Sequence, residues 1–213
     1  MVSGFLNKRE ETIGGIFKSI IKPDREPIDK KIILAHYKIK TSIGRINNYL
    51  DKLEQRDKEL FQTVVESLMK RDEKRAKMYA REVAEVRRVS KQLITAKYAL
   101  EQVSLKLETF LIFGGAIREL PPVIKVMQEA IELTKTVAPD VWIDLQYAIR
   151  ELETSMSAGL AGIEMEIDVG VDSEAKKILE EARIAAEQTL REKFAELPSS
   201  ISVGEEAKTS GTV

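Results

Sequence analysis

Cysteine and histidine, which often act as nucleophiles, acid–base groups and metal ligands, are nearly absent from this sequence. The 213 residues contain no cysteine and a single histidine, His36. Disulfides, thiolate metal sites and sites that need two imidazoles are therefore excluded. His36 falls close to an apolar seam, which predicts a packed or half-exposed side chain. We expect no enzyme, no metal and no cofactor, because there is no second histidine and no acidic pair in a recognisable catalytic frame.

Two further features that often mark ligand sites have a structural explanation here. Gly114 and Gly115 are not followed by the Lys-Ser/Thr pair that a phosphate-binding loop requires. Trp142 falls on a short helix expected after "APD" (138–140), which indicates a packing anchor rather than a platform for a ligand.

Charge is a stronger chemical signal. The net charge is −1, but residues 1–113 carry 24 Lys+Arg against 16 Asp+Glu, while residues 114–213 carry 10 against 19. This split predicts a basic surface that the acidic half covers in the resting state. Aromatic residues that could stack on bases are scarce near it, so we expect an anionic membrane rather than nucleic acid as its partner. The candidate basic surface comprises Lys70, Arg71, Lys74, Arg75, Lys77, Arg81, Arg87, Arg88 and Lys91.

An N-terminal segment, residues 1–27, is predicted to be an amphipathic membrane arm with its linker. Apolar residues in "TIGGIFKSIIKP" (12–23) fall at i, i+3, i+4, i+7 and i+8, one face of a helix that Pro23 ends. The joint "KPDREPID" (22–29) separates this face from the rest of the chain. The alternative is a helix folded back on the hairpin. The candidate membrane-binding residues are Phe5, Leu6, Ile13, Ile16, Phe17, Lys18, Ile20, Ile21 and Lys22.

The elements that must position these residues are helices. Aromatic residues make up 6% and charged residues 32% of the chain, which is typical of long helices with narrow apolar stripes. Apolar residues keep a 3–4 spacing from Ile28 to about Lys70 and again from Ala76 to Phe110, with "KRDEKR" (70–75) between them. The prediction is an all-α fold with a long antiparallel hairpin over about 28–113, each helix roughly 60 Å long.

Shorter helices are expected beyond the hairpin. One is predicted over Val123–Val137 after the prolines at 121–122, and a second over Asp140–Ser157, which completes a helical core of residues 28–157. A flexible acidic linker (158–172) then precedes a C-terminal amphipathic helix (173–197) with Asp172 and Ser173 as N-cap candidates. Residues 198–213 are predicted to be a disordered tail.

The order of elements resembles the ESCRT-III family. The stretch "AKMYAREVAEVRRVSKQLITAKYALEQVSLKLET" (76–109) resembles the second core helix of that family, and "DSEAKKILEEA" (172–182) resembles its late regulatory helix. The resemblance covers about residues 28–197. Among its members the chain looks most like the archaeal cell-division, CdvB-type proteins, in particular the short paralogues without a C-terminal winged-helix region.

The resemblance implies a membrane-scission protein of archaeal cell division. Family members polymerise with themselves and with paralogous ESCRT-III subunits on a membrane, constrict its neck and are taken apart by an AAA ATPase that bears an MIT domain. The segment "EQTLREKFAEL" (187–197) is similar to the MIT-interacting motif of the family, which implies ATPase docking through Glu187, Leu190, Lys193, Phe194 and Leu197. The alternative is that this face closes back onto the basic hairpin, and the two roles could alternate.

The expected location is cytoplasmic, peripheral at the inner membrane face in a division ring at mid-cell. The longest apolar run, "FLIFGGAI" (110–117), is too short to span a bilayer, and the N-terminal segment lacks a signal-peptide pattern. Two alternative functions remain open from sequence. They are a phage-shock-type membrane-stress protein and a soluble coiled-coil protein that binds nucleic acid or acts as a chaperone-type binder.

Overall fold

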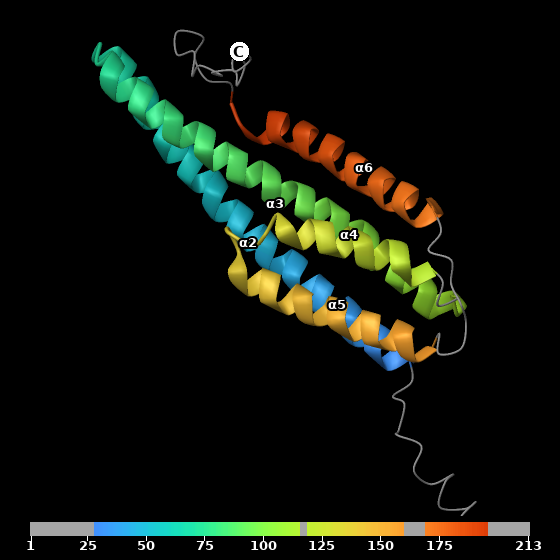
Figure 1. The fold of residues 1–213 in the computed structure, drawn as a ribbon. Helices are drawn as coiled ribbons and strands as arrows, with labels where there is room; N and C mark the ends of the chain where they lie inside the picture. Colours follow the sequence, from blue (N-terminus) through green and yellow to red (C-terminus); the bar gives the residue numbers. More distant parts are fainter. Residues whose placement is uncertain (1–27, 116–118, 160–168, 196–213) are drawn as a thin grey trace, which may run out of the picture.

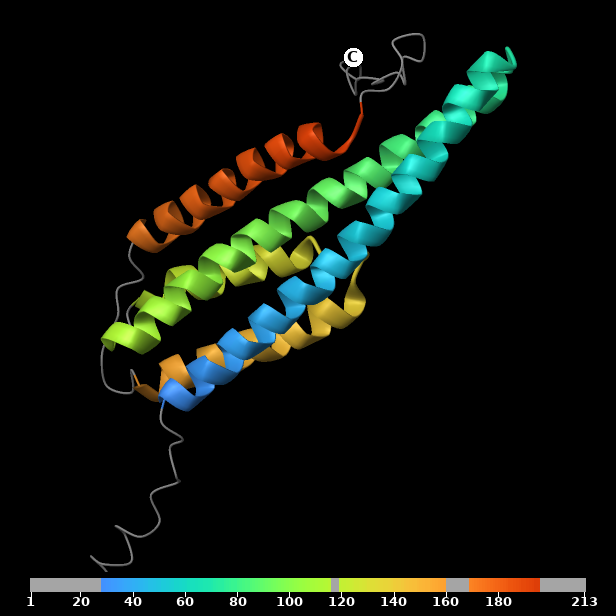
Figure 2. The same cartoon turned by 180° about the vertical axis from the view of Figure 1, so that it is seen from behind.

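The structure is a computed structural model that describes residues 28–115, 119–159 and 169–195. These residues form five helices: α2 (Ile28–Met69), α3 (Glu73–Phe113), α4 (Leu120–Glu132), α5 (Pro139–Gly159) and α6 (Val169–Lys193). The all-α fold and the long antiparallel hairpin predicted from the apolar spacing are confirmed. The hairpin comprises α2 and α3, and its tip extends well beyond the shorter helices (Figures 1 and 2).

The turn of the hairpin lies within the predicted charged cluster. Arg71 takes a left-handed conformation with φ of 57°, and Asp72 donates its backbone N–H to the carbonyl of Ser67 at 2.9 Å. The Asp72 carboxylate then caps α3 by accepting the backbone N–H of Arg75 at 3.0 Å. A three-residue connection can therefore reverse two helices of more than forty residues each.

The far end of α3 is closed by glycine. Gly114 has a φ of 67°, and the backbone N–H groups of Gly114 and Gly115 both donate to the carbonyl of Phe110. A residue with a Cβ would be strained in this left-handed conformation, so Gly114 ends the helix. The glycine pair thus has a structural role, consistent with the sequence prediction.

The two proline residues at 121–122 lie inside α4 rather than ahead of it. The predicted helix began at Val123, but α4 begins at Leu120 and ends at Glu132, before the predicted Val137. Proline is tolerated in the first turn of a helix, where backbone N–H groups have no partner within the helix. The predicted start was therefore three residues late.

The last helix also begins earlier than predicted. α6 begins at Val169, so the first four residues of its helix fall in the range predicted as linker. Asp172 lies in the first turn of α6 and pairs with Lys125 of α4, so the prediction that it caps the helix is wrong. The C-terminal end of α6 is Lys193, four residues before the predicted end.

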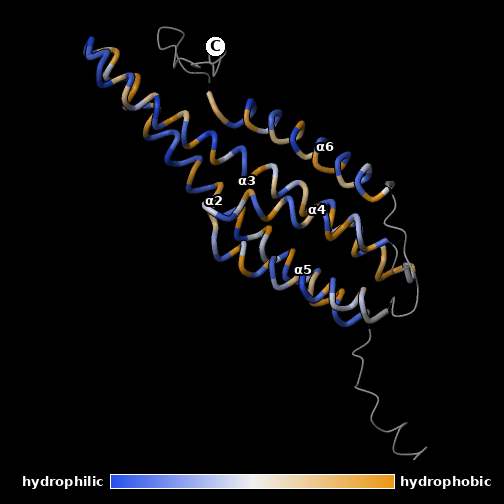
Figure 3. Tube along the Cα trace, viewed as in Figure 1, coloured by the Kyte–Doolittle hydropathy of each residue, from blue (hydrophilic) through white to orange (hydrophobic). Residues whose placement is uncertain are grey.

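Most of the apolar surface lies in one core at the end of the hairpin away from its tip. There α4 packs against α3, α5 and α6, while α5 packs along α2 and α6 along α3. A second, smaller cluster fills the tip between the two hairpin helices alone: Leu60, Val64, Ala76, Ala80 and Val83. Figure 3 shows that hydrophobic residues recur along every described helix in short intervals. No described helix is long and apolar enough to cross a membrane.

Candidate interaction surfaces

α6 lies along α3 and carries the residues that resemble an ATPase-docking motif. Its buried residues recur with helical spacing and pack into the main core: Ala175, Ile178, Leu179, Ala182 and Ala186. Full burial of one large aliphatic side chain is worth about 1.5–3 kcal/mol. With only two large aliphatic residues in this buried row, the apolar attachment of α6 is modest for a helix of 25 residues.

Ion pairs supplement this apolar contact along the length of α6. Lys125 of α4 pairs with Asp172, and Lys106 and Lys91 of α3 pair with Glu174 and Glu187. A hydrogen bond from Lys125 lowers the pKa of Asp172, and one from Lys91 lowers the pKa of Glu187. All three pairs place the cation on the core and the carboxylate on α6. The pairs of Lys91 and Lys106 join the basic and acidic halves of the sequence, whereas Lys125 and Asp172 both belong to the acidic half.

The end of α6 makes the opposite pairing. Lys193 Nζ lies 3.0 Å from Glu54 Oε2 on α2. The pKa of Glu54 is lowered, first by a hydrogen bond from Lys58 and then by one from Lys193. α6 therefore reaches across α3 to contact both helices of the hairpin.

Four of the five candidate docking residues are engaged within the molecule. Glu187 pairs with Lys91, Lys193 pairs with Glu54, and Leu190 packs partly buried against the main core. Phe194 is 8% exposed, and its ring centroid lies 5.5 Å from the guanidinium carbon of Arg87. Leu197 lies outside the described residues. The docking face is thus occupied by the hairpin in this conformation.

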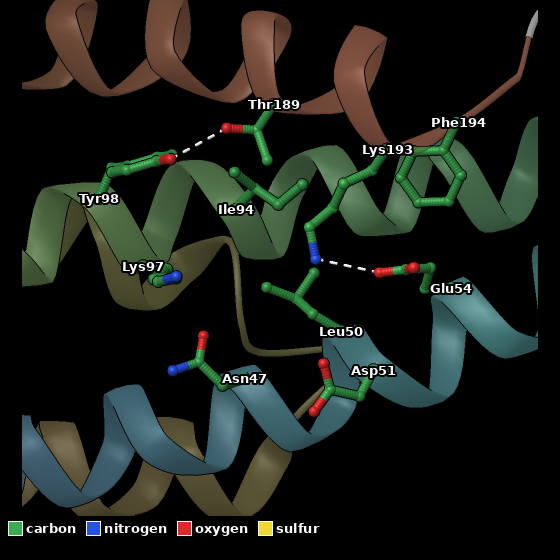
Figure 4. Close-up of a pocket in the computed structure, with 10 residues that line it drawn as sticks. All are labelled: Asn47, Leu50, Asp51, Glu54, Ile94, Lys97, Tyr98, Thr189, Lys193 and Phe194. Carbon is green, nitrogen blue, oxygen red and sulfur yellow. Dashed lines mark hydrogen bonds and ion pairs between the residues drawn. The ribbon is translucent and has the colours of Figure 1, made fainter.

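A small cavity lies where the end of α6 meets the hairpin (Figure 4). Its volume is about 50 Å³, which suits a few water molecules rather than an organic ligand. Tyr98 Oη and Thr189 Oγ1 lie 2.9 Å apart on one side of it, and the Lys193–Glu54 pair lies on another. The lining mixes apolar side chains such as Leu50, Ile94 and Phe194 with these polar groups, so the cavity is a small packing gap between α6 and the hairpin.

The nine candidate basic residues do not form one surface. Six lie exposed at the hairpin tip: Lys70, Arg71, Lys74, Arg75, Lys77 and Arg81. Lys77 Nζ is 3.9 Å from Glu73 on the same helix, and Met69 and Met78 are exposed among the tip cations. The tip therefore combines positive charge with exposed thioether side chains.

The other three candidate cations lie along the shaft of α3 and have partners. Arg88 makes two hydrogen bonds to Glu85 one turn away, and Lys91 pairs with α6. Arg87 Nε and Nη2 bind the Asp57 carboxylate at 2.7 and 3.1 Å. Of the nine cations, only Lys91 pairs with a carboxylate of α6, so the described residues of the acidic half leave the tip uncovered.

The Asp57–Arg87 pair was not anticipated from sequence. The side chains are 6% and 18% exposed, and the pair separates the main core from the tip cluster. Asp57 stands between Leu53 and Leu60 at the seam spacing. A charged residue at a seam position was the available signal.

His36 and Trp142 occupy the structural positions predicted for them. His36 Nε2 lies 2.9 Å from Ser104 Oγ and 3.1 Å from Glu108 Oε1 in the seam between α2 and α3. A hydrogen bond from Lys40 lowers the pKa of Glu108, with smaller contributions from His36. Trp142 is partly buried against the main core, beneath Lys135. Within the described ranges, no group of three His, Asp or Glu residues could hold a metal ion.

The candidate membrane-binding residues of the N-terminal arm, residues 1–27, lie outside the described ranges. Their role stays a prediction.

Comparison with known proteins gives the family. The chain is 39% identical to Cell division protein B1 of Sulfolobus acidocaldarius over 184 aligned residues. The alignment covers 84% of each of the two chains. It is 32% identical to Cell division protein B of the same organism over 172 aligned residues. This alignment covers 80% of the present chain and 66% of that protein. No family model and no solved structure matches the sequence.

A long helical hairpin with a returning C-terminal helix is the architecture expected of an ESCRT-III protein. The extent of identity to the two cell-division proteins makes the assignment specific: the chain belongs to the CdvB-type, ESCRT-III family of archaeal cell-division proteins.

Proposed function

We propose that this chain is a non-catalytic ESCRT-III subunit that polymerises on the cytoplasmic face of the membrane and helps to constrict it during archaeal cell division. The supporting observation is the closed position of α6, whose candidate docking face lies on the hairpin. A subunit held this way joins the polymer less readily than a subunit whose α6 is released. Release frees the docking face for an MIT-bearing ATPase.

The attachment of α6 suits a reversible role. Its ion pairs are exposed to solvent, where each contributes little and is screened by salt. Few large side chains are buried with them. A partner groove that offers Leu190 and Phe194 an apolar site can therefore compete with the hairpin.

The hairpin tip supports the membrane part of the proposal. Its six exposed cations are suited to anionic headgroups, at about 1 kcal/mol per basic residue near a charged membrane surface. Exposed Met69 and Met78 supply apolar contact at the same tip. A single subunit binds weakly, whereas a filament adds many such contacts. Family membership favours this proposal over a phage-shock-type protein or a soluble nucleic-acid binder.

Electron microscopy of the purified chain, with and without anionic vesicles, tests this function. We expect filaments that coat or tubulate the vesicles. The variant Ile16→Asp with Phe17→Asp should lose vesicle co-sedimentation and retain its helical circular dichroism, because carboxylates do not enter the acyl boundary. Ile184→Asp, an exposed position on α6, is the matched control and should bind as the parent does. If both variants co-sediment with vesicles to the same extent, the N-terminal arm does not bind the membrane and has a structural role instead.

Calorimetry with the isolated MIT domain tests the docking motif. Leu190→Asp with Leu197→Asp should abolish binding, while polymerisation persists or increases because the same change loosens α6 from the hairpin. Ile184→Asp again controls for a new carboxylate on α6, since Ile184 is 61% exposed and lies away from the Leu190 face. Equal affinity for the parent and the double variant would reject the assignment.

A further inference from the structure

One face of α2 is turned to solvent although its residues are apolar or uncharged. We call it the outer stripe, and the spacings of 4, 4, 3 and 4 along its main row place its members on one side of the helix. Figure 2 shows α2 in front, with no described helix covering it in that view. Tyr37 is 66% exposed and Ile33 55% exposed. The outer stripe comprises Ile33, Leu34, Tyr37, Thr41, Gly44 and Asn48, all exposed.

Charged residues beside the middle of the outer stripe have partners within the molecule, and Lys30 and Asp51 lie exposed at its two ends. Arg45 Nη1 lies 2.5 Å from Asp144 of α5, and Lys38 lies 3.8 Å from the same carboxylate. On the other side, Lys40 pairs with Glu108 of α3 at 2.5 Å. The Thr41 hydroxyl donates to the carbonyl of Tyr37 in its own helix at 2.9 Å. In a chain with 32% charged residues, this leaves an outer stripe with little charge and little unmet hydrogen bonding.

Gly44 lies within the outer stripe and has no role inside the described molecule. No heavy atom from elsewhere in the described chain lies within 4 Å of the position that a Cβ would take, and its φ is not left-handed. Glycine within a helix is less stable than alanine there. A glycine at such a position leaves room for the close approach of a backbone or side chain from another molecule.

We propose that the outer stripe is a homotypic contact, in which α2 of one copy packs antiparallel on α2 of a second copy about a two-fold axis between residues 40 and 41. The outer stripe is bulky at its N-terminal end and small at its C-terminal end. Antiparallel packing puts Tyr37 of one copy over Gly44 of the other and Ile33 beside Asn48. A parallel pair would set bulky residues against bulky ones and small against small.

A second copy fits this face better than other occupants. An isologous contact requires a surface that does not repel itself. The members of the outer stripe are uncharged, and Lys40, which lies next to the proposed axis, is paired with Glu108 of its own chain. An anionic membrane would instead favour free cations, which lie at the hairpin tip. This contact would be one of the interfaces of the proposed self-assembly. The inference rests on the proposed function, because it takes a second copy of this chain as the partner.

Cysteine cross-linking of the full chain tests the geometry, because the parent has no cysteine. Thr41→Cys lies next to the proposed axis and should form covalent dimers with a short bismaleimide. Ile33→Cys should not cross-link to itself but should do so when mixed with Asn48→Cys. Glu129→Cys, exposed on α4, is the control and should stay monomeric. Self-cross-linking of Ile33→Cys would show a parallel pair and overturn the proposal.

Sedimentation of Gly44→Arg tests the contact without weakening the helix. Arginine is a better helix former than glycine and meets open space here, so the melting temperature should hold or rise. Self-association should fall at least roughly tenfold, because the new side chain occupies the space of the partner's Tyr37. Gln102→Arg, exposed on α3, should associate as the parent does. Unchanged association of Gly44→Arg would reject the contact.

The remaining outcomes separate this contact from the proposed function. Filaments on vesicles without Thr41→Cys dimers would overturn the contact and leave the function standing. Thr41→Cys dimers in a protein that never coats vesicles would support the contact and reject the function. If Thr41→Cys in the monomer reacts slowly with a maleimide and Ile16→Asp with Phe17→Asp restores its reactivity, the N-terminal arm is the occupant and the proposal is overturned.

Discussion

Asp57 and Arg87 hold the middle of the hairpin with an ion pair that is almost enclosed. Arg87 binds Asp57 with two hydrogen bonds, and its guanidinium lies 6.0 Å from the Phe61 ring and 5.5 Å from the Phe194 ring. The pair places charge at one position of a largely apolar seam. Sliding α3 by one turn so that Val83 replaces Arg87 would bury Asp57 without a partner, so the pair disfavours that register of the hairpin.

Removing one partner of this pair should cost much of the hairpin's stability. Asp57→Ala leaves a largely buried guanidinium unpaired, and we expect a loss of about 3 kcal/mol in the free energy of unfolding, measured in urea. Asp57→Leu with Arg87→Leu removes both charges and should lie closer to the parent. If the double variant is as unstable as the single one, the pair has no special role in stability.

Sequence patterns could not have found these particular partners. The alternation of Leu53, Asp57 and Leu60 places Asp57 at the seam, but thirty residues separate it from Arg87. Pairing them requires the hairpin register, which depends on the left-handed Arg71 and the Asp72 cap. The sequence places Arg87 among the candidate basic surface residues, because most cations of a helix are exposed. In the structure, tertiary packing buries much of its side chain against Asp57 instead.

Among the helices, α6 defines the closed conformation, in which it lies against the hairpin and α4. Besides its buried apolar row, it is held to the core by ion pairs between residues 47, 68 and 96 positions apart. The opposite charges of the two halves predicted the attraction, but not the partners. The 3–4 apolar spacing identified the long helices reliably because it extends over some forty residues. No comparable periodic pattern marks where α4 begins, at its prolines, or where α6 begins, so both starts were predicted too late.

Acid should release α6 from the core. The pKa values of Asp172 and Glu187 are lowered in the closed state by Lys125 and Lys91. Their contribution is therefore complete above the ordinary pKa range of these carboxyls and is lost as the pH falls through the lowered values. A pair of fluorophores on Lys177→Cys and Gln102→Cys should report loss of energy transfer over that acidic range. High salt should also loosen α6, through screening.

The matched control for acid release removes the cations. Lys91→Met with Lys125→Met deletes both partners but leaves the α6 carboxylates in place. Its energy transfer should be lower at neutral pH and should change less on acidification. A transition as large as that of the parent would show that other groups govern α6.

On the scale of the whole molecule, the described chain is a rod with a basic tip at one end and a packed multi-helix core at the other. Beyond the hairpin seam, α4, α5 and α6 bury much apolar surface of the hairpin within the subunit. Exposed large apolar side chains of the described residues include members of the outer stripe of α2, the methionines at the tip, and single residues on α3, α5 and α6 such as Phe113, Ile143 and Ile184. Assembly therefore draws on a small exposed surface unless α6 is released.

Charge reversal on the core should open the molecule without touching the docking residues. Lys106→Glu with Lys125→Glu places carboxylates opposite Glu174 and Asp172, at the end of α6 away from Leu190 and Phe194. Repulsion should detach α6, so we expect more vesicle coating in electron microscopy and tighter MIT binding in calorimetry than for the parent. Adding Asp172→Lys with Glu174→Lys restores opposite charges and should return both measurements toward the parent. If coating and MIT affinity stay unchanged in the reversed variant while energy transfer shows that α6 has left, closure of α6 does not control assembly.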